Sequence, residues 1–237
     1  MCGIVGHVAC QASQRSRQVV LDGLSRLEYR GYDSAGIALA SPGKLNVIKA
    51  VGKLVNLREA VDQDTSADAF AGIGHTRWAT HGRPTVANAH PHVSPDGRFA
   101  LVHNGIIENA DNLRAQLRAQ GAIFTSETDT EVVVHLLAHA YDQADPASYT
   151  GEVAQLSGTD EAVARRLVVA MREVTAKLEG TFTLLALSTE SPNVIVAARR
   201  SSPLVIGLGE GENFLSSDVL AFIEHTNRAV EIGQDQL

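Results

Sequence analysis

The chain opens with Met1-Cys2-Gly3-Ile4-Val5-Gly6, a cysteine at the second position followed by an apolar, strand-like run. Methionine is usually trimmed from a new chain when the next residue is small, as cysteine is. Trimming would leave one residue with both a thiol and a free α-amino group. The thiolate is a nucleophile, and an α-amino group with a pKa of ~7.7–8.0 can serve as its base. The segment therefore predicts either an N-terminal nucleophile or a small buried thiol at the start of a strand.

Length and composition narrow the class of protein. The 237 residues suffice for one domain or two small ones, with 44% hydrophobic and 20% charged residues. A net charge of −7 argues against nucleic acid and against an anionic membrane surface. Two cysteines, Cys2 and Cys10, make no disulfide framework, and we expect Cys10 to be buried. Because neither a signal peptide nor a membrane-spanning run is found, we expect a cytoplasmic protein.

Hydrophobic periodicity predicts an α+β fold of layered, mostly antiparallel sheets, because strands come first, then helices, then strands again. Strands are expected at 4–9, 35–40, 45–51, 70–76, 99–103, 182–188, 193–198, 203–207 and 214–216, and helices at 15–29, 54–61, 112–119, 130–141 and 161–178. Gly31 is placed as the C-cap of the first helix. A long loop at 77–92, rich in Gly, Pro, Thr and His, is typical of functional loops.

Four further segments join apolar strand ends to polar or glycine residues: Tyr29-Arg30-Gly31-Tyr32-Asp33-Ser34-Ala35-Gly36, His75-Thr76-Arg77-Trp78-Ala79-Thr80-His81-Gly82, His103-Asn104-Gly105-Ile106-Ile107-Glu108-Asn109 and Ser126-Glu127-Thr128-Asp129-Thr130-Glu131. A cysteine acyl-transfer site needs donors for a developing oxyanion. Asn104 offers a side-chain amide and Gly105 an unhindered backbone N–H. The alternative is that Asn104-Gly105 forms a hairpin turn.

An amino-acid substrate would also need partners for its two charged groups. Arg77 can present a bidentate fork to an α-carboxylate, and Asp129 can accept an α-ammonium. The alternatives are a surface ion pair for Arg77 and a helix N-cap for Asp129.

Together these segments resemble the glutaminase domain of the glutamine–fructose-6-phosphate aminotransferases, a family of class II glutamine amidotransferases. The resemblance runs from Cys2 to about Leu220 and includes Asn213-Phe214-Leu215-Ser216-Ser217-Asp218. The opening Cys-Gly-Ile is shared with other class II amidotransferases, whereas the blocks that begin at Tyr29 and His75 point to the sugar aminotransferases. The family implies the N-terminal-nucleophile hydrolase fold. That fold is a four-layer αββα sandwich, with Cys2 at a strand edge between two mostly antiparallel sheets.

The resemblance also implies roles. Cys2 would attack the side-chain amide of L-glutamine, while Asn104 and Gly105 form the oxyanion hole, and Arg77 and Asp129 hold the substrate carboxylate and ammonium. Other residues of the implied site are Trp78, which gates ammonia; Thr80 and His81, on the loop that closes over glutamine; and Arg30 and Gly31, which support the nucleophile.

We expect residues 1–237 to form one glutamine amidotransferase domain, with the stretch 142–166 as a surface insertion. In the full-length enzyme, expected to be a homodimer, a C-terminal sugar-isomerase domain would bind fructose-6-phosphate and receive the ammonia. No cofactor is expected. If Met1 is retained, the alternative is a catalytically silent module that binds an amino acid or a partner domain.

Histidines offer two possible metal clusters. His135 and His139 have the i, i+4 spacing of a zinc-binding helix, but the glutamate that would follow the first histidine is replaced by Leu136. The loop sequence His90-Pro91-His92, with His75 and His81, lacks cysteine or carboxylate ligands at a set spacing. The sequence therefore favours ordinary core or surface histidines and no metal.

Overall fold

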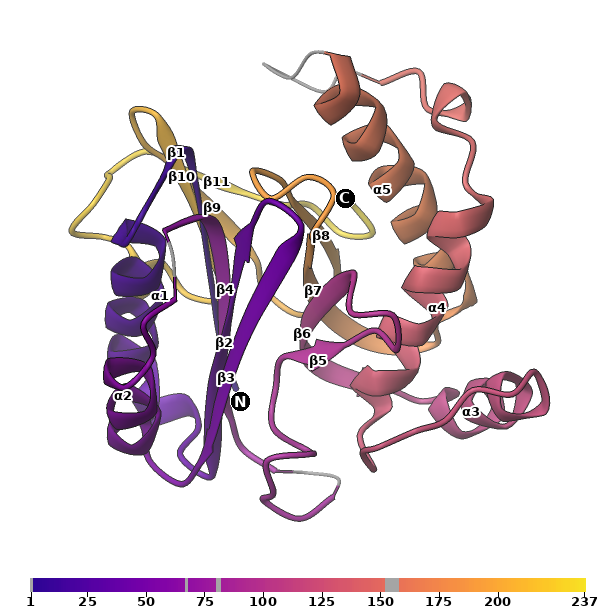
Figure 1. Ribbon diagram of the computed structural model, residues 1–237, viewed down its shortest axis with the longest axis horizontal. Coiled ribbons are helices and arrows are strands. Elements are labelled where there is room, and N and C mark those ends of the chain that lie inside the picture. Colours follow the sequence, from indigo (N-terminus) through magenta and orange to yellow (C-terminus); the bar gives the residue numbers. More distant parts are fainter. Residues whose placement is uncertain (1, 67, 80–81, 152–157) are drawn as a thin grey trace.

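Two antiparallel sheets face one another in the computed structural model, which describes residues 2–66, 68–79, 82–151 and 158–237 (Figure 1). The first sheet has the strand order β11-β9-β10-β1-β4-β2-β3. Its strands, in chain order, are β1 (Gly3–Ser13), β2 (Ser34–Ser41), β3 (Lys44–Val51), β4 (Ala69–Arg77), β9 (Val205–Leu208), β10 (Glu212–Ser216) and β11 (Ala229–Glu231). Cys2 thus lies immediately before β1, a strand in the interior of the sheet.

The second sheet has the order β5-β6-β7-β8, with β5 (His92–Val93), β6 (Phe99–Ile107), β7 (Gly180–Ser188) and β8 (Ile195–Arg200). Helices α1 (Arg15–Arg26) and α2 (Leu54–Asp62) cover the first sheet, and α4 (Asp129–Gln143) and α5 (Gly158–Lys177) cover the second (Figure 1). Helix α3 (Ala110–Ala119) lies beside α4, and short 3₁₀ turns occupy Glu28–Arg30, Pro146–Ser148 and Val219–Ala221. The result is the expected four-layer αββα sandwich.

The alternation of side chains along β1 explains why apolar layers lie on both faces of the first sheet. Ile4 joins Ile73, Val102 and Leu185 in the apolar layer between the sheets, whereas Val5 packs with Leu24 of α1 on the outer side. Successive side chains of a strand point to opposite faces, so one apolar strand serves both layers. Burial of both faces of β1 fixes the backbone that carries Cys2.

The expected strands and helices are confirmed, apart from their ends. Strand β6 runs four residues beyond the expected end, so Asn104-Gly105 lies within a strand, opposite Thr183 and Phe182 of β7, and does not form a hairpin turn. Pairing with β7 overrides the local preference of Asn-Gly for a turn.

Two expectations were wrong. Gly31 is extended, with φ of −168°, and the C-cap of α1 is Leu27. Cys10 is exposed, because β1 extends past the edge of the core after Val8. Within the stretch 142–166, α5 begins at Gly158, Ala164 is buried, and Arg165 donates to the carbonyl oxygens at 149 and 151, whereas residues 152–157 lie outside the described ranges.

No helix in the described ranges is long and apolar enough to cross a membrane.

Candidate active site

The thiol of Cys2 lies against the backbone where β4 ends. The Trp78 N–H donates to Cys2 Sγ at 3.2 Å, and Sγ lies 3.7 Å from the Trp78 carbonyl oxygen. Burial raises the pKa of the Cys2 thiol, while the Trp78 hydrogen bond acts in the opposite direction by favouring the thiolate. Cys2 is therefore a half-buried thiol with one backbone donor already aimed at its sulfur.

Several of the predicted residues share one cavity with Cys2. The cavity lining comprises Cys2, His75, Arg77, Trp78, His90, His103, Gly105, Thr128, Asp129 and Thr130. These residues come from the starts or ends of β1, β4, β6 and α4 and from the loop before β5. Cys2, Arg77, Trp78, Gly105 and Asp129, all named from the sequence, are thus brought together by the fold.

Asn104 is hydrogen-bonded directly to Cys2. Its Nδ2 donates to the Cys2 carbonyl oxygen at 2.9 Å, and its Oδ1 lies 3.0 Å from His75 Nε2. A primary amide has two N–H groups, and the bond to Cys2 uses one of them. The second N–H is the group that an oxyanion formed at Cys2 could use.

Gly105, the next residue, has a backbone that only glycine adopts easily. Its φ is +131°, and a Cβ there would lie 2.0 Å from the Thr181 carbonyl oxygen. Both facts make glycine necessary at this position. They also keep the rim of the cavity beside Asn104 free of a side chain.

Arg77 ends β4 and is 4% exposed, so it is not a surface ion pair. Its Nη2 donates to the Gly82 carbonyl oxygen at 3.3 Å, which ties it to the loop that follows. Thr80 and His81 of that loop lie outside the described residues. Trp78 is half-exposed, and its ring packs edge-to-face on Tyr32 with centroids 5.3 Å apart.

Asp129 is the first residue of α4, and its side chain does not cap the helix. Oδ2 accepts from the Ile107 N–H at 2.9 Å, and Oδ1 lies 3.8 Å from His103 Nδ1. Although burial opposes ionisation, these contacts and the N–H of Thr130 hold the pKa of Asp129 far below its usual range. Asp129 is therefore an anion at neutral pH and faces the cavity.

The block from Tyr29 to Gly36 supports the end of β4. A Cβ on Gly31 would lie 2.7 Å from the Arg77 carbonyl carbon, so glycine permits the close approach of the two segments. Asp33 accepts from the Ala79 N–H and, through its own N–H, donates to the Arg77 carbonyl oxygen at 3.1 Å. Arg30 pairs with Asp218 and lies over the Tyr29 ring. Sequence reasoning missed Asp33, although it belongs to a segment that was singled out.

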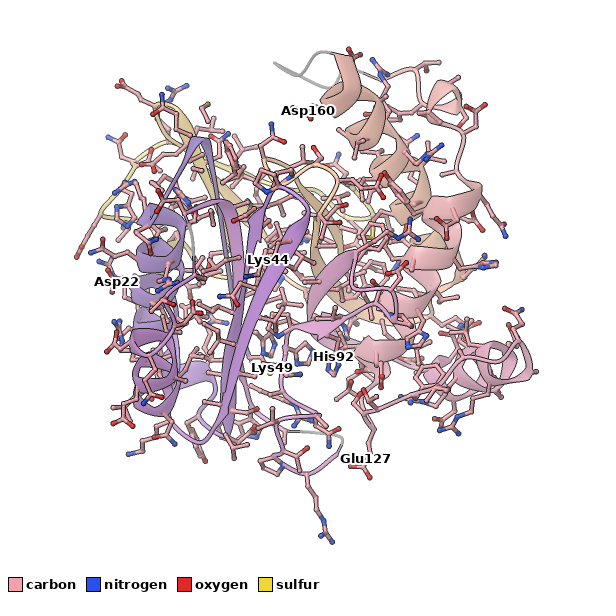
Figure 2. All side chains as sticks on the ribbon, viewed as in Figure 1. Asp22, Lys44, Lys49, His92, Glu127 and Asp160 are labelled. Atoms are coloured by element: carbon pink, nitrogen blue, oxygen red, sulfur yellow. The ribbon has the colours of Figure 1, made fainter. Side chains whose placement is uncertain are left out.

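Buried histidines pack beside the cavity; the sequence grouped His75 and His90 only as a possible metal cluster and gave His103 no role. His75 and His90 stack with ring centroids 4.1 Å apart, and His90 Nε2 and His103 Nδ1 lie 2.8 and 3.0 Å from Thr130 Oγ1. Lys49 of β3 donates to the Ala89 carbonyl oxygen at 2.7 Å and so holds the loop beside His90. Figure 2 shows Lys49 and His92 between β3 and β5. Among the described residues, no group of three or more histidine, cysteine or carboxylate side chains could hold a metal ion.

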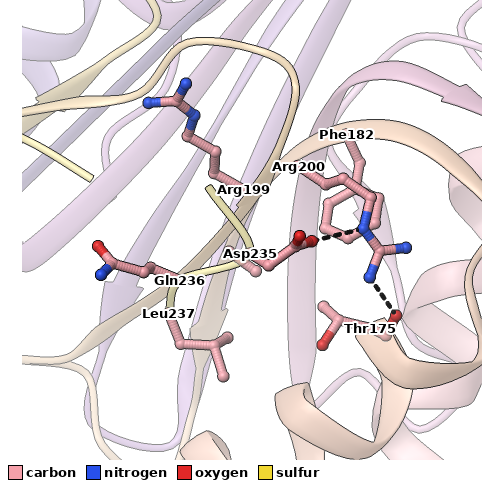
Figure 3. Close-up of a pocket in the computed structure, with 8 residues that line it drawn as sticks. Thr175, Phe182, Arg199, Arg200, Asp235, Gln236 and Leu237 are labelled. Atoms are coloured by element: carbon pink, nitrogen blue, oxygen red, sulfur yellow. Dashed lines mark hydrogen bonds and ion pairs between the residues drawn. The ribbon is translucent and has the colours of Figure 1, made fainter. Parts of the chain in front are cut away.

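A second hollow lies far from Cys2 in the chain, between the end of α5 and the last residues (Figure 3). Both guanidinium groups that line it already have partners: Arg200 Nε pairs with Asp235 at 2.6 Å and its Nη1 donates to the Leu178 carbonyl oxygen at 2.8 Å, while Arg199 Nη1 pairs with Glu231 at 2.7 Å. These contacts anchor the C-terminal residues to the second sheet and suggest a structural role.

Two facing antiparallel sheets, with a cysteine before an interior strand, define the N-terminal-nucleophile fold of the class II glutamine amidotransferases. The family described as "Glutamine amidotransferase domain" matches residues 40–148. The chain belongs to these domains, and relatives 53–54% identical over its whole length place it, within them, in the type found in glutamine–fructose-6-phosphate aminotransferases.

Curated relatives support this assignment. The glutamine–fructose-6-phosphate aminotransferase of Leifsonia xyli is 53% identical over 238 residues, and that of Streptomyces coelicolor is 54% identical over 237. Both alignments cover 100% of this chain but only 35% of the relative. The chain therefore spans about a third of the length of these relatives.

Solved structures agree on the fold. The glutamine phosphoribosylpyrophosphate amidotransferase of B. subtilis, complexed with ADP and GMP, aligns with a TM-score of 0.72 at 25% identity and covers 98% of this chain and 46% of that one. An allosteric regulatory enzyme of purine biosynthesis aligns with a TM-score of 0.74, also at 25% identity, and covers 98% of this chain and 45% of that one.

Proposed function

We propose that the chain hydrolyses L-glutamine to glutamate and ammonia through a thioester on Cys2. One observation carries the proposal. The Cys2 thiol shares its cavity with a buried guanidinium at Arg77 and a carboxylate at Asp129, and Asn104 is hydrogen-bonded to Cys2 itself. A cation, an anion and a nucleophile in one cavity match the carboxylate, ammonium and amide of one amino acid.

The reaction begins after removal of Met1. The α-amino group of Cys2 takes the thiol proton, and the thiolate attacks the side-chain carbonyl carbon of glutamine. The oxyanion formed is stabilised by the free N–H of Asn104 and the backbone N–H of Gly105. Collapse of this intermediate breaks the C–N bond, and the proton held by the α-amino group leaves with ammonia.

Water then attacks the thioester, and the same α-amino group removes a proton from it. The C–S bond breaks, glutamate is released and the Cys2 thiol is restored. Arg77 and Asp129 hold the α-carboxylate and α-ammonium of the substrate through both steps. Trp78 and the loop that contains Thr80 and His81 would enclose the substrate, while Arg30 and Gly31 brace the end of β4.

The test uses purified protein whose intact mass shows whether Met1 has been removed. The form that begins at Cys2 is expected to release ammonia and glutamate from glutamine. The form that keeps Met1 is expected to be inactive, because the nitrogen of Cys2 is then an amide and cannot accept a proton. Equal turnover by both forms would show that another group is the base. No turnover by the Cys2 form would favour a silent amino-acid-binding module.

We further propose that the ammonia serves a longer protein of which this chain is one domain. The names of the curated relatives point to fructose-6-phosphate as acceptor, bound by a C-terminal sugar-isomerase domain in a cytoplasmic homodimer. The test compares this chain with a longer protein that carries the C-terminal domain. Amino-sugar is expected only from the longer protein. Amino-sugar formed by this chain alone would place the sugar site within these residues.

A further inference from the structure

We propose that His75 is a positioning residue that sets the orientation of the Asn104 amide, so that its N–H groups, and not its oxygen, face Cys2. The inference rests on the proposed function of Asn104 as an oxyanion donor. That function alone does not say that His75 orients the Asn104 amide, nor that His75 must carry its proton on Nε2.

Hydrogen-bond partners fix the direction of the amide. The Cys2 carbonyl oxygen can only accept, so the Asn104 atom 2.9 Å from it must be the nitrogen. His75 Nε2 lies 3.0 Å from the His103 carbonyl oxygen, which also can only accept, so Nε2 must carry a proton. The same N–H then donates to Asn104 Oδ1 at 3.0 Å. Each end of the amide thus has a partner of the right kind.

The imidazole itself is held in place from several sides. His75 is 1% exposed and stacks on His90, and His90 Nε2 lies 2.8 Å from Thr130 Oγ1 on α4. The His90 carbonyl oxygen lies against Gly36, where a Cβ would approach it to 2.2 Å. The ring therefore has little freedom to rotate away from Asn104.

Charge at His75 is excluded by the same burial. Burial lowers the pKa of His75 to about 3, so the ring is neutral at the pH at which the enzyme works. A neutral ring with a proton on Nε2 has none on Nδ1. His75 is consequently a single donor with a fixed direction, and it acts on the reaction only through Asn104.

Loss of that donor would leave Asn104 Oδ1 without its partner and would free the amide to rotate. A rotated amide would place its oxygen toward the developing oxyanion and repel it. Removal of one oxyanion donor costs about 10²–10³ in kcat. Partial loss of the correct orientation is therefore expected to lower kcat by about 10- to 100-fold.

The experiment compares His75→Leu with His75→Gln in the full chain, with Cys10 replaced by serine so that only Cys2 reacts with thiol reagents. The glutamine amide nitrogen can occupy the place of Nε2 and donate as it does. His7→Gln is the matched control, because His7 is equally buried but bonds to Ser16 and Glu212, outside the cavity that contains Cys2. Two rates are measured for each variant: glutamine turnover and alkylation of Cys2 by iodoacetamide, a displacement that forms no oxyanion.

We expect His75→Leu to lower kcat about 10- to 100-fold, with KM and the alkylation rate changed less than about 3-fold. His75→Gln should recover kcat to within about 5-fold of the parent, and His7→Gln should match the parent. Unchanged kcat in His75→Leu would overturn the inference. So would a kcat as low in His75→Gln as in His75→Leu while alkylation of both stays normal.

If His75→Leu does not fold, the tautomer can be read from the parent protein. A long-range ¹H–¹⁵N NMR spectrum at pH 7 is expected to show the His75 proton on Nε2, and a proton on Nδ1 would refute the hydrogen-bond assignment. If Cys2 of the parent protein is alkylated but glutamine is not turned over, the proposed function is refuted. The tautomer of His75 would still test whether His75 orients the Asn104 amide.

Discussion

Replacement of Asn104 by alanine tests the proposed oxyanion hole most directly. The side-chain amide makes two contacts, a donated bond to the Cys2 carbonyl oxygen and an accepted bond from His75. Alanine removes both of these, together with the second N–H that would meet the oxyanion. The backbone N–H of Gly105 remains, so one donor survives.

The magnitude follows from those contacts. Loss of one preorganised donor predicts a fall in kcat of about 10²–10³, equivalent to about 2.7–4 kcal/mol of transition-state stabilisation. KM should change only a few-fold, because Arg77 and Asp129 lie on β4 and α4 and keep their own contacts. Stability should fall by only about 1 kcal/mol, because His75 still donates to the His103 carbonyl oxygen.

Steady-state kinetics with glutamine, together with urea unfolding, separate these effects. The reasoning predicts a large loss of kcat in a protein of nearly normal stability. A raised KM with unchanged kcat would show that Asn104 binds substrate. A loss of several kcal/mol in stability would show that its bond to Cys2 matters mainly for folding.

Arg77→Lys should raise KM about tenfold or more with little change in kcat, since a point charge replaces a planar fork. A lowered kcat with an unchanged KM in steady-state kinetics would instead assign Arg77 to catalysis. A diazo-ketone analogue of glutamine should label Cys2 and spare Cys10, although Cys10 is exposed, because only Cys2 shares a cavity with Arg77 and Asp129; peptide mapping that finds both cysteines equally labelled would contradict the site. Acid should destabilise the fold, because burial lowers the pKa of His75 and of His92 to about 3. Between that pH and the ordinary histidine pKa of about 6.5, the unfolded chain binds protons that the folded chain excludes, so stability falls as pH falls. At pH 5 each histidine should cost about 2 kcal/mol relative to pH 7.5. Urea unfolding at both pH values tests this: His92→Gln should reduce the loss by about 2 kcal/mol, and an equal loss in that variant would refute the assignment.

Much of this protein could be predicted from local sequence. The alternation in β1, the hairpin of β2 and β3, and the 3.6-residue period of α1 each lie within one short segment, where the pattern alone decides which face is apolar. The position of Cys2 after the initiating methionine made it a candidate nucleophile, with a buried thiol as the alternative, and only the other sequence blocks favoured the first interpretation. The class of chemistry was therefore readable from the chain.

Other features depend on contacts between distant segments. Gly31 looked like a helix cap, but the close approach of the Arg77 backbone is what demands a glycine there. Cys10 looked buried, yet no local pattern states where a strand leaves the core. The dipeptide Asn104-Gly105 is equally consistent with a hairpin turn. Only its pairing with β7 holds it in a strand, with the Asn104 side-chain amide beside Cys2.

By itself, then, the sequence determined most of the strands and helices and named Cys2 as a candidate nucleophile, because those follow from periodicity and residue type within a few positions. The tertiary structure decided which side chains surround Cys2 and how they are oriented. His75, His90 and His103 lie on different segments, and nothing in their spacing places them together. They meet because two sheets pack face to face, which excludes water, lowers the pKa of His75 and of His90, and turns an imidazole N–H toward the Asn104 amide.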